Sequence, residues 1–308
     1  MAESGRVGRW VRSRHSGLSD NMQGILAMTA ASMFFITNDS TVKVVGASLP
    51  VPQIVFLRGA IAAVLILIVA RHLGHLKPIP RPAWGKLTIR TLAEISCTLL
   101  YLTSLMHMPI PNSTAILQTA PLFLTIYAAL IIKEGVGWRR WSAVIFGFIG
   151  MLLIVKPGTD GFNAYAVLAI VAALMVTTRD LLTRVMPHDI PAITITLITM
   201  AGLSAAGGVL TLATGEWAPV SLRDALLICL SAGVLTIGFI CVITAMRKGE
   251  VSVVTPYRYT ILIGALFYGY VLFGEVPDML SGLGILLIVG SNLYVFARER
   301  RKRIVRPQ

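Results

Sequence analysis

The stretch Thr37–Val44, which reads TNDSTVKV, returns later in the chain as Thr178–Val185, which reads TRDLLTRV. The threonine, the aspartate, the basic residue and the last valine all match at an offset of 141 residues (178 minus 37). Two glutamates that each follow an apolar stretch, Glu134 and Glu275, are separated by the same offset. Matches at two distant places with one offset indicate an internal duplication.

The composition places both copies in a membrane. Of 308 residues, 56% are hydrophobic and 13% are charged, and the mean hydropathy is +0.77. A soluble domain carries about 25% charged residues, so this chain lacks the polar surface that keeps a protein in water. The composition therefore excludes an ordinary soluble enzyme, a disordered chain and a collagen-like fibre, and it predicts a helical protein with many membrane spans.

Ten stretches have the roughly 20 mostly apolar residues that a helix needs to cross a bilayer. They are residues 23–46, 53–71, 87–106, 111–132, 138–155, 162–184, 192–214, 225–246, 251–273 and 277–297. We therefore expect an all-α integral membrane protein with ten transmembrane helices. These form two five-helix repeats, 23–155 and 162–297, between basic tails at 1–22 and 298–308. Because five is odd, the second repeat enters the membrane from the opposite side, which is the inverted topology typical of transporters.

The basic residues predict the orientation. If the N-terminus is cytoplasmic, the inside segments hold 20 Lys and Arg, whereas the outside segments hold only Lys156 and Arg223. Cytoplasmic segments carry the excess of positive charge, so we expect both termini in the cytoplasm. The expected location is the inner membrane of the cell. The net charge of +13 is then a topology signal, with lipid headgroups rather than nucleic acid as the partner.

Charged residues inside the spans are the main candidate functional residues, because each costs about 2.5–3.5 kcal/mol to insert. Their depths place them in two clusters. The outer cluster holds Asn38, Asp39, Lys43 and Arg58, and the inner cluster holds Glu94, Arg179, Asp180 and Arg258. We interpret the clusters as two gates that open in turn. Static ion pairs are the alternative, formed along one helix by Asp39 with Lys43 and by Asp180 with Arg184.

The acids and the mid-span proline suggest further roles. Asp39, Glu94 and Asp180 are candidate carriers of a coupling proton, and exchange against a counter-substrate is equally open. Pro121 frees the carbonyl of Leu117 beside the amide of Gln118. These two groups form either a polar handle for substrate or a packing kink.

Three further features have both a functional and a structural interpretation. Tyr257 and Tyr259 flank Arg258 and could stack on a planar ligand, although the membrane interface also suits Tyr257. Leu262, the repeat partner of Pro121, is not a proline, so a helix break is expected in the first repeat alone. Glu134 and Glu275 are interpreted as structural residues that tether the start of the next helix.

Catalytic and cofactor motifs are absent from the sequence. There is no G-x-x-x-x-G-K-[ST] loop, no H-E-x-x-H and no G-x-S-x-G. The three cysteines lie in apolar stretches without metal-ligand spacing. We therefore expect no enzyme activity, no cofactor and no metal site, with an integral-membrane lipid-modifying enzyme or a non-transporting membrane subunit as the alternative class.

The fourth and fifth spans carry a more specific pattern. It runs through Pro111-Asn112-Ser113-Thr114-Ala115, Gln118-Thr119-Ala120-Pro121, Glu134, Arg139-Arg140-Trp141 and Lys156-Pro157-Gly158. This pattern resembles the EamA-type domain of the drug/metabolite transporter superfamily, and Pro256-Tyr257-Arg258-Tyr259 with Gly274-Glu275 resembles it in the second half. The resemblance implies secondary transport of a small organic metabolite by alternating access. Among members, the S-adenosylmethionine and riboflavin transporters are the most similar, and an amino-acid or drug exporter of the same fold is the alternative.

Overall fold

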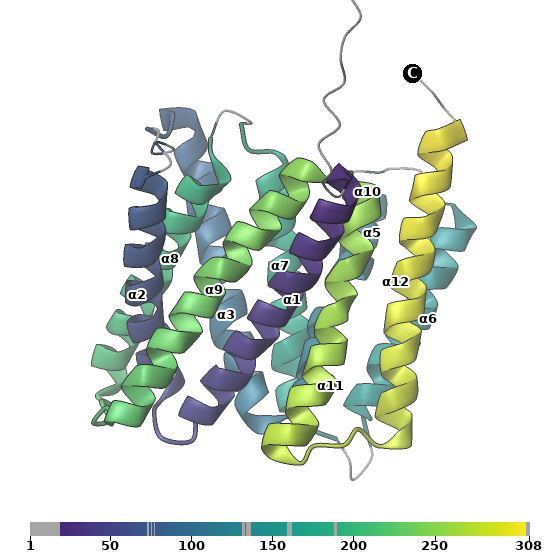
Figure 1. Ribbon diagram of the computed structural model, residues 1–308. Helices are drawn as coiled ribbons and strands as arrows, with labels where there is room; N and C mark the ends of the chain where they lie inside the picture. The colour runs from purple at the N-terminus through teal and green to yellow at the C-terminus, as the bar shows by residue number, and fades with distance from the viewer. Residues whose placement is uncertain are drawn as a thin grey trace, which may run out of the picture.

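In the computed structural model, the chain forms a bundle of long helices (Figure 1). The structure describes residues 19–72, 74, 76, 78–130, 133, 137–158, 162–187 and 190–305. The basic N-tail up to residue 18, Glu134 and the last three residues lie outside this part, as do the side chains from residue 298 onward. Expectations for those residues stay predictions.

The first repeat contains six helices and one short 3-10 turn. They are α1 (Asp20–Val45), α2 (Val51–His72), η1 (Arg81–Ala83), α3 (Trp84–His107), α4 (Ile110–Leu117), α5 (Ala120–Leu130) and α6 (Trp138–Val155). The second repeat contains α7 (Tyr165–Arg184), α8 (Ala192–Thr214), α9 (Leu222–Lys248), α10 (Val251–Val254), η2 (Thr255–Tyr259), α11 (Thr260–Phe273) and α12 (Met279–Val305). If η1 is counted with α3, α4 with α5, and α10 and η2 with α11, the described chain has ten helical segments. Within the described residues the regular structure is entirely helical.

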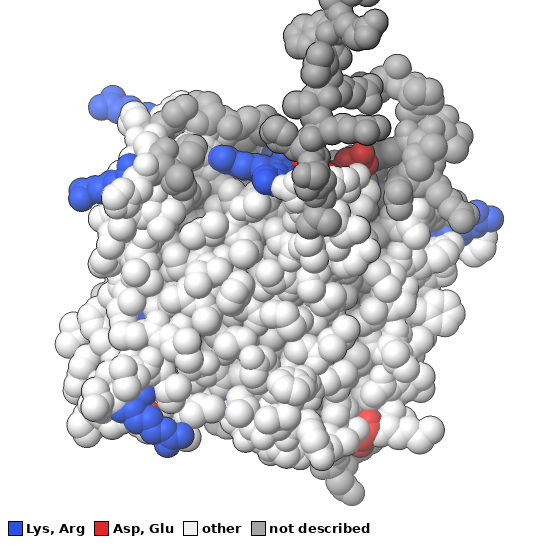
Figure 2. Space-filling view, in the orientation of Figure 1, with Lys and Arg blue, Asp and Glu red and all other residues white. Residues whose placement is uncertain are grey.

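The surface of the bundle matches a membrane protein. Seven helical segments are long and apolar enough to cross a membrane, namely α2, α4 with α5, α6, α7, α8, α9 and the first 19 residues of α12. In the view of Figure 2, charged side chains gather at the two ends of the bundle and a broad uncharged band lies between them. The band fits the hydrocarbon core of a bilayer, where exposed charge is costly.

The helix contacts repeat with the symmetry that the duplication predicts. α1 packs along α9, and the repeat partners of these two helices, α7 and α3, also pack along each other. α1 contacts α11, just as α7 contacts α4 and α5, while α2 with α8 and α6 with α12 pair each helix with its own partner. In Figure 1, α1 begins and α12 ends at the same end of the bundle. We call this the near end, and we call the opposite end, where α1 finishes and α4 begins, the far end.

The helix interruption occurs in both repeats, contrary to the sequence-based expectation. α4 ends at Leu117 and α5 begins at Ala120, and at the matching place η2 ends at Tyr259 and α11 begins at Thr260. Tyr259 lies 141 residues after Gln118, so the two junctions are repeat partners. A proline at position 262 is not needed, because the irregular turn in the second repeat contains Pro256 near its start.

Candidate substrate and gating site

One face of α3 connects the two charged clusters. Glu94, Cys97 and Tyr101 follow the three- and four-residue spacing that aligns side chains along a helix. Seven residues of helix separate Glu94 from Tyr101, or about 10 Å. The clusters therefore lie at two levels along one face of α3.

The hydrogen bonds of the outer cluster centre on Asn38. Its Oδ1 accepts hydrogen bonds from Arg58 Nη1 at 3.2 Å and from Ser231 Oγ at 2.7 Å. Its Nδ2 donates to Asp39 Oδ1 at 2.9 Å, and the Tyr101 hydroxyl donates to Asp39 Oδ2 at 3.0 Å. Four helices, α1, α2, α3 and α9, therefore meet at one asparagine and its neighbouring aspartate.

Arg58 is held in an unusual environment for a cation. Its side chain is 6% exposed, and no carboxylate of the described residues forms an ion pair with it. Its Nε is buried without a hydrogen-bond partner among the described groups. Buried charges in proteins are usually paired, because unpaired ones lose their hydration without compensation. The site therefore holds a buried guanidinium with an unsatisfied N–H donor.

The ion pairs of the inner cluster centre on Arg179. Its Nη1 donates to both carboxylate oxygens of Glu94, at 2.9 and 3.2 Å, and its Nε donates to Asp180 Oδ1 at 2.9 Å. Arg258 lies near enough to Asp180 to act on it electrostatically. This cluster joins α3 to α7 by a charge-assisted contact that no single-helix rule could predict.

Arg90, near the start of α3, also makes specific contacts. It donates from Nε to Thr183 Oγ1 at 2.9 Å and from Nη1 to Thr199 Oγ1 at 2.7 Å. These bonds tie α3 to α7 and α8 close to the near end of the bundle.

Lys43 closes the far end. Its Nζ donates to Glu275 Oε1 at 2.5 Å and to the carbonyl of Met108 at 2.6 Å. The second carboxylate oxygen, Oε2, accepts from the backbone N–H of Ile110 at 2.7 Å. The pair is mostly buried, with side-chain exposures of 11% and 16%, and the lysine lies over the ring of Phe273. One lysine thus fastens the end of α1 to the α3–α4 connection and to the end of α11.

These contacts correct the expected ion pairs along single helices. Lys43 pairs with Glu275 rather than with Asp39, and Asp180 pairs with Arg179 rather than with Arg184. The tethering role expected of Glu275 is present, but it holds the start of α4 and not the start of α12. Lys43 reaches a carboxylate from the other repeat, at the end of α11, whereas Asp180 pairs with its neighbour Arg179 on the same helix, α7.

A second lysine–carboxylate pair at the far end is exposed. Lys156 donates to Asp278 Oδ2 at 2.8 Å, with side-chain exposures of 22% and 50%. This hydrogen bond lowers the pKa of Asp278 to about 2. The pair joins the end of α6 to the segment before α12, and it serves as a natural contrast to the buried pair.

The α4–α5 junction is held by α12. Asn292, which is 1% exposed, donates from Nδ2 to the carbonyl of Gln118 at 3.1 Å. Gln118 is itself buried, and Pro121 lies in the first turn of α5 rather than inside a continuous helix. The carbonyl that a side chain engages is thus that of Gln118, and not the carbonyl of Leu117 that the sequence favoured.

The two tyrosines beside Arg258 have different surroundings. Tyr257 is 39% exposed, whereas Tyr259 is buried and meets the ring of Phe296 edge-on. The carbonyl of Arg258 accepts a hydrogen bond from Ser32 on α1 at 3.2 Å. Tyr259 therefore has a packing role in this conformation, and Tyr257 alone presents its ring outward.

Several contributing residues were not singled out by sequence. Ser231, Thr114 and Asn292 are polar residues within apolar spans, and Ser231 lies at the repeat offset from Arg90. Tyr101 connects Asp39 with Thr114, whose hydroxyl lies 3.3 Å from the phenol oxygen. Considering every polar residue in the predicted spans would have identified these three as candidates, but it would not have predicted their hydrogen-bond partners.

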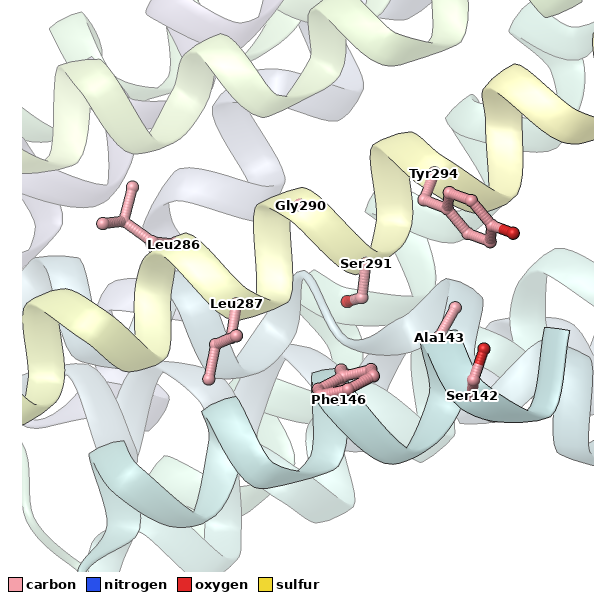
Figure 3. A pocket seen from close by; sticks show the side chains of 8 residues that line it. All are labelled: Ser142, Ala143, Phe146, Leu286, Leu287, Gly290, Ser291 and Tyr294. Atoms are coloured by element: carbon pink, nitrogen blue, oxygen red, sulfur yellow. The ribbon is translucent and has the colours of Figure 1, made fainter. Parts of the chain in front are cut away.

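The cavity between α6 and α12 contains no residue of either charged cluster. It has a volume of about 300 Å³. The residues that line it are Ser142, Ala143, Phe146, Leu286, Leu287, Gly290, Ser291 and Tyr294 (Figure 3). The lining carries no charged side chain, so it lacks the groups that bind a polar metabolite. Among the described residues, no cluster of three His, Cys, Asp or Glu side chains could hold a metal ion either.

Comparison with known proteins gives one consistent family. The model of the EamA-like transporter family matches residues 22–156 and again 163–297. A riboflavin transporter of Vibrio cholerae is 29% identical over 91% of this chain and 95% of its own length. An S-adenosylmethionine uptake transporter of Rickettsia felis is 27% identical over 63% of this chain and 65% of its own. A pseudopaline exporter of Pseudomonas aeruginosa is 25% identical over 86% of this chain and 93% of its own.

The fold is also found in a solved structure. A chain in a crystal structure superposes with a TM-score of 0.62, covering 91% of this protein and 99% of itself. The sequence identity is 16%, so this likeness concerns the fold alone.

Proposed function

Because the chain belongs to the EamA-like transporter family, we propose that it is a secondary transporter that moves a small polar organic metabolite by alternating access. It is a multi-pass protein of the inner membrane. The observation that carries the proposal is the position of the buried polar contacts. Ser231 donates to Asn38, Arg179 donates to Glu94, and Lys43 donates to Glu275. Each contact joins one repeat to the other, where transporters of inverted topology bind substrate.

The symmetry of the helix contacts supports alternating access. Each repeat can adopt the arrangement of the other, so that the bundle opens first at one end and then at the other. In the conformation described, Lys43 and Glu275 fasten the far end. With both termini in the cytoplasm, the far end faces outward, and the two charged clusters act as the gates. Asp39, Glu94 and Asp180 are the candidates for carrying a coupling proton, with exchange against a counter-substrate as the alternative.

Riboflavin and S-adenosylmethionine are the proposed substrates, because the similar proteins named above include transporters of each. Export is the alternative direction, and the similarity to a pseudopaline exporter supports it. Uptake and export differ in the side from which substrate first reaches Arg58, and the symmetry of the fold permits both. An amino-acid or drug exporter would use the same interface between the two repeats, which contains Asn38, Arg58, Glu94, Arg179 and Ser231 and is called the seam below.

A ligand screen by thermal stability tests the substrate. The purified full-length protein in detergent is heated with riboflavin, flavin mononucleotide, S-adenosylmethionine, amino acids and nucleosides. A ligand of the folded state stabilises it by about 2.7 kcal/mol at a hundredfold excess over its dissociation constant. Stabilisation by riboflavin or S-adenosylmethionine supports the proposed substrates, whereas stabilisation by neither removes both.

Two variants test the gates. Arg58→Ala and Arg258→Ala are each expected to abolish uptake of the stabilising ligand into proteoliposomes, while the protein remains folded in the membrane. Arg139→Ala is the matched control, because Arg139 is exposed and stacks on Trp138 outside the seam. Full transport by both seam variants would remove the gating role. Turnover of a lipid without transport would instead favour a membrane enzyme.

A further inference from the structure

Arg58 and Asp39 lie in the same cluster with opposite charges, yet they form no ion pair. They are close enough to interact electrostatically. The side chain of Asn38 connects them, with its oxygen accepting from Arg58 and its nitrogen donating to Asp39. Two opposite charges that are free to meet in a low-dielectric interior attract strongly. The asparagine therefore holds them apart as a fixed dipole.

Asn38 is itself fixed by Ser231. The serine hydroxyl donates to the same Oδ1 that accepts from Arg58, so both acceptor positions of that oxygen are used. This orients the amide, and Nδ2 must then face Asp39. The spacing between the guanidinium and the carboxylate is consequently set by a side chain that is 3% exposed and bonded across the seam.

The guanidinium has donors left over. Arginine carries five N–H donors in a planar fork suited to a carboxylate. In the described structure one hydrogen bond is made, by Nη1 to Asn38, and Nε is buried without a partner. A carboxylate or a similar acceptor from a ligand would satisfy the buried Nε, and none of the described carboxylates forms an ion pair with Arg58.

The aspartate has acceptor capacity left over. Each oxygen accepts one hydrogen bond, from Asn38 and from Tyr101. An ionised carboxylate has about four acceptor positions, so about two stay free. Those positions suit the donors of an ammonium group.

We propose that Arg58 and Asp39 bind the zwitterionic headgroup of an α-amino acid, with the substrate carboxylate on Arg58 and the substrate ammonium on Asp39. This rests on the proposed function and narrows its substrate class. S-adenosylmethionine carries an α-amino and an α-carboxyl group, whereas riboflavin carries neither. The site thus favours the first substrate, or another molecule with an amino-acid headgroup, over the second.

Binding of matched ligand pairs tests the headgroup. The full-length protein in lipid nanodiscs is titrated with S-adenosylmethionine and with its decarboxylated analogue, and with each common α-amino acid and its decarboxylated amine. Loss of a charge-assisted carboxylate contact is expected to weaken binding by about 10- to 100-fold. This comparison uses the unchanged protein, so it does not depend on the folding of any variant.

Variants then locate the contact. In Arg58→Gln the discrimination between acid and decarboxylated amine is expected to fall below about threefold, and Arg58→Lys is expected to restore part of it as a single point charge. The exposed control Arg139→Gln is expected to keep the full discrimination.

Three binding results overturn the proposal. They are equal binding of acid and amine, unchanged discrimination in Arg58→Gln, and no binding of any α-amino acid or S-adenosylmethionine at millimolar concentration. If the Arg58→Gln variant transports riboflavin at the wild-type rate, the proposed headgroup site is refuted, but the proposal that the chain is a transporter still stands. Absence of transport for every probe would remove the proposed function itself.

Discussion

The lysine at the far end allows the sharpest perturbation of the structure. In Lys43→Met, the bonds to Glu275 and to the carbonyl of Met108 are lost, and Glu275 stays mostly buried without its counter-charge. Breaking a buried pair by removing one partner costs about 3–5 kcal/mol. Because Glu275 keeps the bond from the N–H of Ile110, we expect a loss near the lower value, about 3 kcal/mol.

The exposed pair at the same end supplies the control. Lys156→Met removes the same chemical contact, but Asp278 is half exposed. Exposed pairs contribute about 0–1 kcal/mol. For a chain of this size, each kcal/mol shifts the melting temperature by about 2 °C. We therefore expect a fall of about 6 °C for Lys43→Met and of about 2 °C or less for Lys156→Met in nanodiscs.

Thiol labelling measures the opening directly. Cys97 is buried on the α3 face between the two clusters. In a background with Cys229 and Cys241 replaced by serine, a membrane-impermeant maleimide should label Cys97 faster in Lys43→Met than in the parent protein. The reasoning is refuted if the two lysine variants melt alike and label Cys97 at the rate of the parent.

Three further outcomes follow from single contacts. Gly207→Leu should prevent folding, because a Cβ there would lie 2.6 Å from a backbone nitrogen of α2. Gly233→Leu is the control and should express normally, because no atom lies within 4 Å of a Cβ at that position. Equal yields of the two variants would contradict this packing. Asn292→Ala should cost about 1 kcal/mol by freeing the carbonyl of Gln118, read as a lower melting temperature. The depressed pKa of Asp278 means that its contribution is present above the ordinary value of 3.8 and lost as pH falls through about 2. The stability difference between wild type and Asp278→Asn should therefore shrink over that interval, and a difference as large at pH 2 as at neutral pH would exclude this cause.

Much of the fold could be predicted from the sequence because the bilayer imposes a simple rule. A span needs a long apolar stretch, and such stretches are visible without any partner. The offset that relates Asp39 to Asp180 also predicted the duplication, which reappears in the symmetric packing of α1 on α9 and of α7 on α3.

The pairing of charges could not be predicted in the same way. The spacing rule for helices considers neighbours on one helix, and it paired Lys43 with Asp39. The actual partner, Glu275, lies 232 residues away and reaches the lysine only after two repeats have packed. The break before α11 was missed for a related reason, since a proline at the position matching Pro121 was used as the sign of a break, whereas the irregular turn has its proline earlier, at Pro256.

Counterflow in proteoliposomes tests most directly whether this chain is a carrier with a binding site between its repeats. The purified protein is reconstituted, the vesicles are loaded with unlabelled S-adenosylmethionine or riboflavin, and trace labelled ligand is added outside. We expect transient accumulation of label that saturates with external ligand, is absent in empty vesicles and is lost in Arg58→Ala. No accumulation for either ligand or for the amino acids, with folded protein in the membrane, would contradict transport by this chain.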